Sequence, residues 1–181
     1  MLITLFTLIY RFIASPDGMW KDLAPDRDAG NEKFHNDYFH ILIGVIALVA
    51  FAGVFLSGGS FGVALKAVIR EAVTLFGSLY LAAYGIRFLA NRKFGVSLSR
   101  RICEKYVGYS SAAVYVSAIA SALFPAFPWF HLFALYSFVI ARSGAEYYLG
   151  LKSPFEGFAF TATTVIVLSP WALRGLLYVA I

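Results

Sequence analysis

The sequence contains few charged residues. Asp, Glu, Lys and Arg make up 14% of its 181 residues, whereas an average globular chain carries about 25%. Hydrophobic residues account for 60% of the chain and aromatic residues for 18%. Because a water-soluble domain needs a charged surface, this scarcity argues against one and favours an integral membrane protein. The length is that of a single domain.

Cysteine and histidine are also scarce, with one cysteine and three histidines in the chain. The single Cys103 excludes an intrachain disulfide and a metal site built from several thiolates. His35 and His40 are five residues apart, about 140° around a helix of 3.6 residues per turn, so we expect them to face apart. The sequence therefore predicts no metal ion and no cofactor.

Catalytic sequence motifs are missing as well. The chain has no HExxH motif and no glycine loop that cradles phosphate. No apolar stretch brings a serine near a histidine and a carboxylate, so we expect a protein that is not an enzyme. The net charge of +5 does not predict a nucleic-acid partner. Basic residues in short loops beside apolar spans are what the positive-inside rule requires.

The chain has instead a series of long apolar stretches. A transmembrane helix needs about 20 apolar residues, and five stretches come near that length: 38–57, 66–90, 106–124, 129–148 and 157–178. The sequence therefore predicts an all-α fold, an integral membrane bundle of five transmembrane helices that occupies residues 38–181. We expect Ser153 and Pro154 to start the last helix.

Residues 1–37 precede the first predicted span. Leu2–Ile13 is apolar but too short to cross a bilayer, so we expect a short helix in the membrane interface or against the bundle. No basic residue comes before its apolar part and Pro16 follows directly, which argues against a cleaved signal peptide. Trp20 suits the membrane–water interface, and residues 21–37 form a polar cytoplasmic connection.

The third predicted span is rich in small residues. Of the 15 residues in Gly108–Ala122, 10 are Gly, Ala or Ser. Small side chains let helix backbones approach closely, and close packing holds membrane helices together. We therefore expect this helix to lie at the centre of the bundle. Small helix faces also make a homo-oligomer an expected partner.

Basic residues are distributed unevenly between the two sides of the predicted bundle. With five spans and the N-terminus inside, 12 of the 15 Lys and Arg residues lie on the inner side and 3 on the outer side. The positive-inside rule relates such a bias to orientation. We therefore expect the N-terminus in the cytoplasm and the C-terminus outside.

Two short motifs accompany this layout. An apolar leader is followed by Pro16 and Trp20, and a basic loop leads into Gly108, Tyr109 and Ser110. The first resembles the N-terminal entry of prokaryotic members of the Yip family, the Ypt/Rab-interacting integral membrane proteins. The second resembles the Gly-Tyr-Ser signature at the start of that family's third span. Five spans with a cytoplasmic N-terminus also resemble the family.

The sequence departs from the family in two places. Members often carry a proline a few residues after the signature, and Ser111–Val116 contains none. Eukaryotic members have a long cytosolic N-terminal region, whereas only residues 1–37 precede the first span here. The chain therefore resembles the prokaryotic branch, and Rab binding is not implied. The resemblance implies a bacterial inner-membrane protein without established chemistry, acting as a scaffold or trafficking partner.

Polar residues near or within the spans are the candidate functional residues: Glu71, Arg87, Arg142, Glu146, Thr161 and Thr164. Intramembrane charge is costly and often marks function. Most of these charges lie within a turn or two of a span boundary, where snorkelling of long side chains offers a structural alternative. We expect Arg142 to pair with Glu146 one turn away, and Arg87 to reach Glu104 or Tyr109.

Two functions follow from these observations. The first is a non-enzymatic membrane scaffold or partner-binding protein, because residues typical of packing outnumber residues typical of chemistry in the spans. Its expected partners are the lipid bilayer, other membrane proteins and a second copy of the chain. The alternative is a small transporter, channel or lipid-translocating protein, which Glu71, Arg87 and the threonines of the last span favour.

Overall fold

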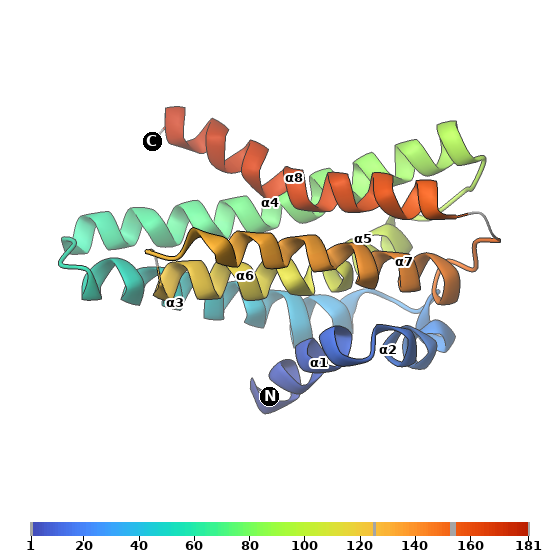
Figure 1. Cartoon of the computed structure of the whole chain (residues 1–181), viewed down its shortest axis with the longest axis horizontal. Helices are drawn as coiled ribbons and strands as arrows, with labels where there is room; N and C mark the ends of the chain where they lie inside the picture. The colour runs from blue at the N-terminus through green and yellow to red at the C-terminus, as the bar shows by residue number, and fades with distance from the viewer. Residues whose placement is uncertain (1, 125, 153–154, 181) are drawn as a thin grey trace.

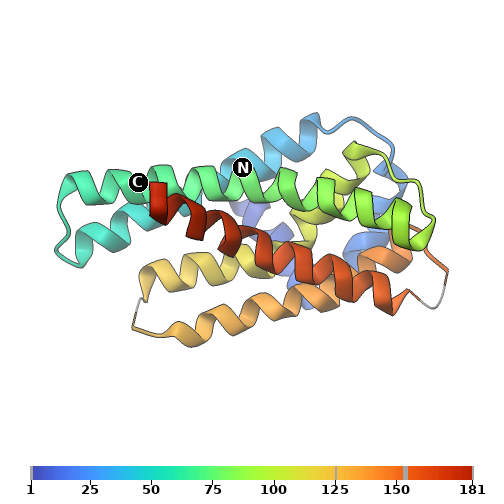
Figure 2. The same cartoon turned by 90° about the horizontal axis from the view of Figure 1, so that it is seen from above.

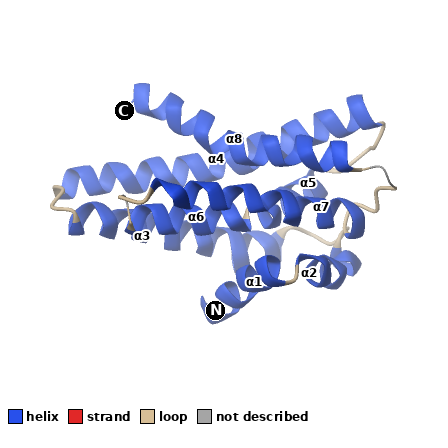
Figure 3. Ribbon diagram, in the orientation of Figure 1, coloured by secondary structure: helices blue, strands red, loops and turns tan. Residues whose placement is uncertain are grey.

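The computed structural model describes residues 2–124, 126–152 and 155–180, and every regular element within these ranges is a helix (Figure 3). The prediction of an all-α fold is confirmed. In chain order the elements are α1 (Leu2–Ala14), α2 (Pro16–Leu23), η1 (Ala24–Asp26), η2 (Phe34–Phe39), α3 (His40–Leu56), α4 (Phe61–Phe94), α5 (Arg100–Ser110), α6 (Ala112–Leu123), η3 (Pro128–Tyr136), α7 (Ser137–Tyr147) and α8 (Glu156–Ala180).

Long helical segments run back and forth along the molecule (Figures 1 and 2). They are η2 with α3, α4, α5 with α6, η3 with α7, and α8. The turn 57–60 between α3 and α4 lies at one end, with the end of α6 and the start of η3; we call it the hairpin end. Residues 24–33, the connection 95–99 and the start of α8 lie at the opposite end, which we call the lead end.

Three helical segments are long and apolar enough to cross a membrane: Phe34–Leu56, Phe61–Phe94 and Glu156–Leu177. The pair α5 and α6, bent by 45°, makes a fourth if it counts as one span. The described residues therefore give three to four candidate spans by length and composition, and not clearly the five predicted. Predicted span 129–148 is absent from this set because Pro128–Tyr136 forms a 3₁₀-helix and only Ser137–Tyr147 is α-helical.

The bend between α5 and α6 lies at Ser111. The Oγ of Ser111 donates a hydrogen bond to Val107 O at 2.8 Å, and the Ser111 N–H donates to the same oxygen at 2.9 Å. A serine that bonds back to the carbonyl four residues earlier often bends a helix. The predicted single helix 106–124 is therefore two helices, and the first of them begins earlier, at Arg100.

Helix α4 is the longest element and extends beyond the predicted range 66–90. Its 34 residues begin after Ser60, whose side chain accepts a hydrogen bond from the Val63 N–H at 3.4 Å. The helix ends at Gly95, which adopts a left-handed conformation with φ of 66°. Both are common helix-terminating devices. At about 1.5 Å per residue, α4 is about 51 Å long, so it projects beyond a hydrocarbon core of about 30 Å.

Helix α8 begins close to where the sequence predicts. Its first residue is Glu156, whereas Ser153 and Pro154, which we expected to start the helix, lie outside the described residues. Pro170 lies inside the helix. Proline removes one backbone hydrogen bond and commonly kinks a helix. In Figure 1 the second half of α8, which contains Pro170, leans away from α4.

The N-terminal helices pack against the bundle through buried side chains. Leu5, Ile9 and Phe12 of α1 are buried, as expected for a helix lying against the bundle. Trp20 of α2 is fully buried rather than exposed at an interface, and its Nε1–H donates a hydrogen bond to Ile140 O at 2.8 Å. Burial of this indole fixes α2 against α7, because a buried N–H needs a partner.

Candidate functional site

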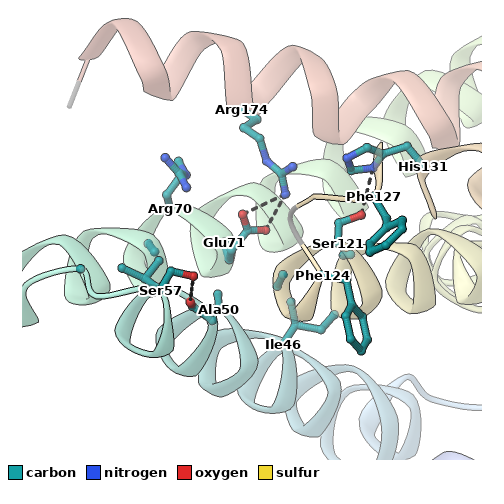
Figure 4. A pocket seen from close by; sticks show the side chains of 16 residues that line it. Ile46, Ala50, Ser57, Arg70, Glu71, Ser121, Phe124, Phe127, His131 and Arg174 are labelled. Atoms are coloured by element: carbon teal, nitrogen blue, oxygen red, sulfur yellow. Dashed lines mark hydrogen bonds and ion pairs between the residues drawn. The ribbon is translucent and has the colours of Figure 1, made fainter. Parts of the chain in front are cut away.

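A pocket of about 500 Å³ lies between α3, α4, α6, η3 and α8 at the hairpin end (Figure 4). We call it the polar pocket. Small and apolar residues of α3 and α6 form one wall. Charged and polar residues from the other elements converge on it: Arg70 and Glu71 from α4, Ser121 from α6, His131 from η3 and Arg174 from α8. Four segments distant in sequence therefore contribute to one site.

The wall formed by α3 and α6 depends on a close backbone approach at Gly53. A Cβ atom placed on Gly53 would lie 2.2 Å from Ala122 O. Only glycine allows two helix backbones to come this close. The small residues of the third predicted span thus serve helix packing, as the sequence predicted, and they also shape one side of the polar pocket.

An ion pair joins Glu71 and Arg174 across the polar pocket. Arg174 Nη2 donates to both carboxylate oxygens of Glu71, at 2.9 and 2.7 Å (Figure 4). Glu71 is only 8% exposed, so its charge depends on this partner. Removing one member of a buried pair leaves an uncompensated charge and typically costs about 3–5 kcal/mol. The pair therefore ties α4 to α8 and places two opposite charges within the bundle.

His131 lies at the edge of the polar pocket, between two neighbours. Its Nδ1 is 3.5 Å from the Oγ of Ser121. On its other side, its ring meets the ring of Trp171 edge to face, with 5.0 Å between centroids. His131 is thus held between α6 and α8.

Nε of Arg174 and Oγ1 of Thr74 are buried beside the pocket and make no hydrogen bond among the described residues. Arginine carries five N–H donors, and the bonds to Glu71 come from one nitrogen only. Buried polar groups without partners are rare and call for an explanation such as a bound molecule. The polar pocket therefore has donors left for a ligand.

The structure places the other candidate polar residues away from this pocket. Thr161 is half-buried and Thr164 is exposed on α8, and their hydroxyls donate to carbonyls of their own helix at 2.7 and 2.9 Å, respectively. Arg142 is exposed and lies over the ring of Phe155, with 5.6 Å from Cζ to the centroid. The expected ion pair of Arg142 with Glu146 is not among those formed by the described residues.

Arg87 does not make the contacts that we expected with Glu104 or Tyr109. It is exposed on α4. The carboxylate of Glu104 contacts three other residues: Arg100 Nε at 2.6 Å, Asn31 Nδ2 at 2.7 Å and His35 Nε2 at 3.4 Å. Asn31 and His35 belong to residues 1–37, which we call the lead, and Arg100 belongs to α5 itself.

The residues of the Gly-Tyr-Ser signature lie in an aromatic cluster near the lead end. The ring of Tyr109 packs against Phe12, Phe34 and Tyr38, with centroids 5.0, 5.1 and 4.9 Å away. A Cβ atom on Gly108 would lie 2.3 Å from Phe34 Cζ, so glycine makes room for this ring. The role of this motif in the described structure is to pack the lead against α5.

Pro16, Trp20 and Ser110 belong to the same part of the molecule. Pro16 is the first residue of α2, where its fixed φ and missing N–H are tolerated. Trp20 meets Tyr109 edge to face at 6.0 Å between centroids. Ser110 is fully buried, and its Oγ makes no hydrogen bond among the described residues. The residues that carry the family resemblance therefore converge in space, although about 90 positions separate them in sequence.

A second buried charge, which sequence analysis did not predict, anchors the lead. Lys105 is only 6% exposed. Its Nζ donates to three backbone carbonyls of the lead: Asp26 O at 3.0 Å, Arg27 O at 3.3 Å and Ala29 O at 2.8 Å. An ammonium group has three donors, so these bonds satisfy all of them. Residues 26–29 are thereby held against α5.

The prediction that His35 and His40 face apart is wrong. Their rings stack with 5.7 Å between centroids. Residues Phe34–Phe39 form a π-helix rather than an α-helix, and in a π-helix the backbone repeats through i→i+5 hydrogen bonds. Residues five apart therefore lie on the same face. No group of three metal-ligating side chains assembles among the described residues.

The pairing of Glu71 with Arg174 is the feature of the polar pocket that sequence reasoning missed. Glu71 was recognised as a charge near a span boundary, but no partner was assigned to it. The topology places Lys66, Arg70 and Arg174 at the same end of the bundle, and a charge of opposite sign at the same depth is the natural partner for an arginine. Matching intramembrane charges by depth would have suggested this pair.

Comparisons with known proteins add no family to this description. No protein-family model, no curated protein and no solved structure matches the chain. The polar pocket and its ion pair are therefore the basis for a functional assignment.

Proposed function

We propose that this chain is a five-span integral membrane protein of the Yip type that binds a polar or amphiphilic small molecule in the polar pocket and moves it along the bundle. It is a small transporter or lipid-translocating protein rather than an enzyme. The observation that carries the proposal is the Glu71–Arg174 ion pair beside a pocket of about 500 Å³ between apolar helices. Charges kept at such a place usually serve substrate or ion pathways.

The length of η3 with α7 supports the fifth span. A 3₁₀-helix rises about 2.0 Å per residue, so the nine residues of η3 extend about 18 Å. The first five residues of α7, before Arg142, add about 7.5 Å at 1.5 Å per residue. The sum of about 25 Å approaches the hydrocarbon thickness of about 30 Å. The same 14 residues would extend only about 21 Å as an α-helix, so the 3₁₀ conformation brings the stretch closer to the length of a span.

The distribution of charge supports the orientation. The hairpin end carries Lys66, Arg70 and Arg174, whereas the lead and the connections at the lead end carry most of the remaining basic residues. The positive-inside rule then puts the lead end in the cytoplasm and the polar pocket toward the outside. For a bacterial inner-membrane protein, the pocket would open toward the periplasmic side of the membrane.

The proposal is tested with purified protein in vesicles of phosphatidylethanolamine and phosphatidylglycerol. Lipid movement is followed by dithionite quenching of a fluorescent lipid, and ion movement by a pH-sensitive dye. We expect movement above the empty-vesicle rate, and a roughly tenfold loss in E71Q and R174Q because one charge of the pair is then unmatched. The variant K66Q removes an exposed cation at the same end and should behave as wild type.

A wild-type rate equal to that of empty vesicles for lipid and ion alike would refute the transport proposal. A rate that E71Q and R174Q leave unchanged would refute the role of the pocket in it.

A second function, a non-enzymatic scaffold or partner-binding protein, is favoured by the way the lead is held. Lys105 bonds three carbonyls of residues 26–29, and Asn31 bonds Glu104. A polar segment ordered in this manner presents a fixed cytoplasmic surface, which lowers the entropic cost of binding a partner. Its partners would be other membrane proteins or a second copy of the chain. Crosslinking in native membranes should capture the same partner in independent preparations, and capture of random neighbours alone would end this hypothesis.

A further inference from the structure

We propose that the second half of α8 is a hinged arm that opens and closes one side of the polar pocket, with the Glu71–Arg174 ion pair as its latch. The arm consists of residues 170–177. The inference rests on the function proposed above, because a molecule held between helices needs a way in and out. Three features carry it: a break in the helix at Pro170, weak packing of the arm beyond that break, and an ion pair that fastens the arm to α4.

The hinge lies where two neighbouring residues weaken α8. Pro170 has no N–H, so the helix lacks the backbone hydrogen bond that would reach back to Ile166 O. The Oγ of Ser169 donates to Val165 O at 2.5 Å, and a serine bonded back to the preceding turn often bends a helix. Sharp kinks arise mostly at prolines and at breaks of this kind. In Figure 1 the ribbon of α8 leans away from α4 in this half of the helix.

The arm is packed less tightly than the rest of α8. Within residues 156–177, the buried residues all precede the proline: Phe158, Ala159, Ala162, Thr163, Ile166 and Ser169. Every residue of the arm is half-buried or exposed, and Trp171 and Leu176 are 52% and 68% exposed. Segments with few buried apolar contacts open at a lower free energy than the core does. The first half of α8 is therefore fixed in the bundle, and the arm can move as a unit.

The contacts that fasten the arm to α4 lie beside the polar pocket. Arg174 Nη2 bonds both carboxylate oxygens of Glu71. Leu173 lies over Gly77, where an added Cβ would be 2.8 Å from the Leu173 Cδ1. A ring contact of the arm with η3 adds to these. The ion pair dominates, because Glu71 is buried and a buried charge that loses its partner is strongly destabilising.

Movement of the arm opens the polar pocket. Among the described residues, α8 contributes Arg174 to the lining of the pocket, and this residue belongs to the arm (Figure 4). The wall of α3 and α6 is fixed by the close backbone approach at Gly53. When the arm swings away from α4, the guanidinium leaves and the pocket loses its α8 side. A closed arm keeps a bound molecule in the bundle, as mobile lids do in other proteins.

Distances between paired spin labels, measured by electron paramagnetic resonance, test the movement of the arm. The full-length protein in lipid nanodiscs carries C103A, one label at G62C, where nothing lies within 4 Å of an added Cβ, and a second at the exposed L176C. We expect a short distance for the latched arm and a longer one for the open arm. R174Q should raise the ratio of long to short distances by about 10- to 100-fold, because a hydrogen bond of a charged group is lost.

Matched variants separate the latch and the hinge from a general loosening of the protein. The double variant E71Q/R174Q leaves no unmatched charge and should also raise the ratio, whereas K66Q removes an exposed cation at the same end and should not. P170A restores the backbone N–H and should lower the ratio. A label at F160C, exposed in the first half of α8, should give one narrow distance to G62C in every variant.

A single cysteine in the pocket measures whether the arm controls access. Ala118 lines the pocket from α6, so A118C in the C103A background is treated with N-ethylmaleimide. L173A removes the contact with Gly77 but lies outside the pocket lining, and it should accelerate the modification several-fold. L176A changes an exposed residue of the same arm and should leave the rate unchanged. Thermal unfolding in detergent confirms that each variant is folded.

A single distance between G62C and L176C that R174Q and the double variant leave unchanged would overturn the arm. A wild-type ratio in P170A would overturn the hinge, and equal modification of A118C in L173A and L176A would overturn the gate. These measurements need no transport. Two arm positions in a protein that moves neither lipid nor ions keep the hinged arm and refute the transport function, whereas transport with one arm position does the reverse.

Discussion

At the scale of single residues, three glycines decide how closely parts of the molecule approach. Gly53, Gly108 and Gly144 each face a neighbour that would lie under 3.0 Å from an added Cβ atom. At Gly53 the neighbour is a backbone oxygen, and at the other two it is an aromatic ring. Tight packing of this kind replaces the hydrophobic driving force that is absent between helices in a bilayer.

Replacing Gly144 with alanine should destabilise the protein by about 1–3 kcal/mol, the usual cost of overpacking. The new Cβ would lie 2.7 Å from Trp20 Cε2 and 2.9 Å from Tyr106 Cε2. Neither ring moves aside easily, because each is fixed by a hydrogen bond to α7 at 2.8 Å. Chemical unfolding in detergent measures the change.

The matched control is G175A, at an exposed position of α8 where nothing lies within 4 Å of the added atom. It should be neutral or stabilising by about 0.5–1 kcal/mol, because glycine is unfavourable inside a helix. Equal destabilisation by G144A and G175A would show that ring packing at Gly144 is not the cause.

Replacing Tyr109 with phenylalanine should change stability by less than about 0.5 kcal/mol. The side chain contributes through ring contacts with Phe12, Phe34 and Tyr38, and phenylalanine keeps the ring. Y109A removes these contacts and should cost about 3–5 kcal/mol. A large loss of partner capture or lipid movement in a stably folded Y109F would instead assign a function to the hydroxyl group.

At the scale of elements, the lead is part of the fold because α5 holds it. Lys105 supplies three hydrogen bonds to the carbonyls of residues 26–29, and Glu104 bonds Asn31. The aromatic cluster around Tyr109 adds apolar contacts to α1 and η2. In isolation, the polar residues of the lead would form a mobile connection. Helix α5, which follows the basic loop, holds them in place.

The variant K105M should release residues 26–29 while preserving the aliphatic part of the side chain. A hydrogen bond from a charged group contributes about 1.5–3 kcal/mol, so local opening should become roughly 10- to 100-fold more frequent. Limited trypsin digestion followed by mass spectrometry measures cleavage after Arg27. K33M removes an exposed lysine of the same segment and should leave this cleavage unchanged. An equal rate in both variants would contradict the anchoring role of Lys105.

At the scale of the whole molecule, the number of membrane crossings depends on one segment. Length and composition give three to four candidate spans, and η3 with α7 is the additional segment of the five-span proposal. In Figures 1 and 2 this segment runs the length of the bundle beside α6 and α8. If it crosses the membrane, the connections before and after it lie on opposite sides.

Single-cysteine variants in a C103A background test this topology, with a membrane-impermeant maleimide applied to intact cells. G62C and A126C, at the hairpin end, should react in intact cells. S97C and K152C, at the lead end, should react only after permeabilisation; all four positions are exposed. Reaction of K152C in intact cells together with A126C would show that η3 and α7 do not cross. Reaction of S97C in intact cells would reverse the orientation.

The sequence predicted the all-α class and the segments of the bundle, because hydrophobic length and charge scarcity depend only on local composition. Spans 38–57 and 157–178 coincide with α3 and α8 to within a few residues. The conformation of span 129–148 was harder to predict, because the sequence has no distinct hydrophobic period that would indicate a 3₁₀-helix. The π-helix at Phe34–Phe39 could not be recognised in the sequence either. It places His35 and His40 on the same face, whereas we expected them to face apart.

The candidate site was predictable only in part. Glu71 was identified as a costly intramembrane charge, whereas Thr161, Thr164 and Arg142 proved to be satisfied on their own helices or over a neighbouring ring. Sequence alone determined which residues carry charge and roughly how deep each lies, since these follow from composition and order. The tertiary structure decided that Glu71 meets Arg174 across 103 positions of sequence. Such pairing depends on how α4 and α8 pack, and packing is set by side-chain shape along the entire bundle.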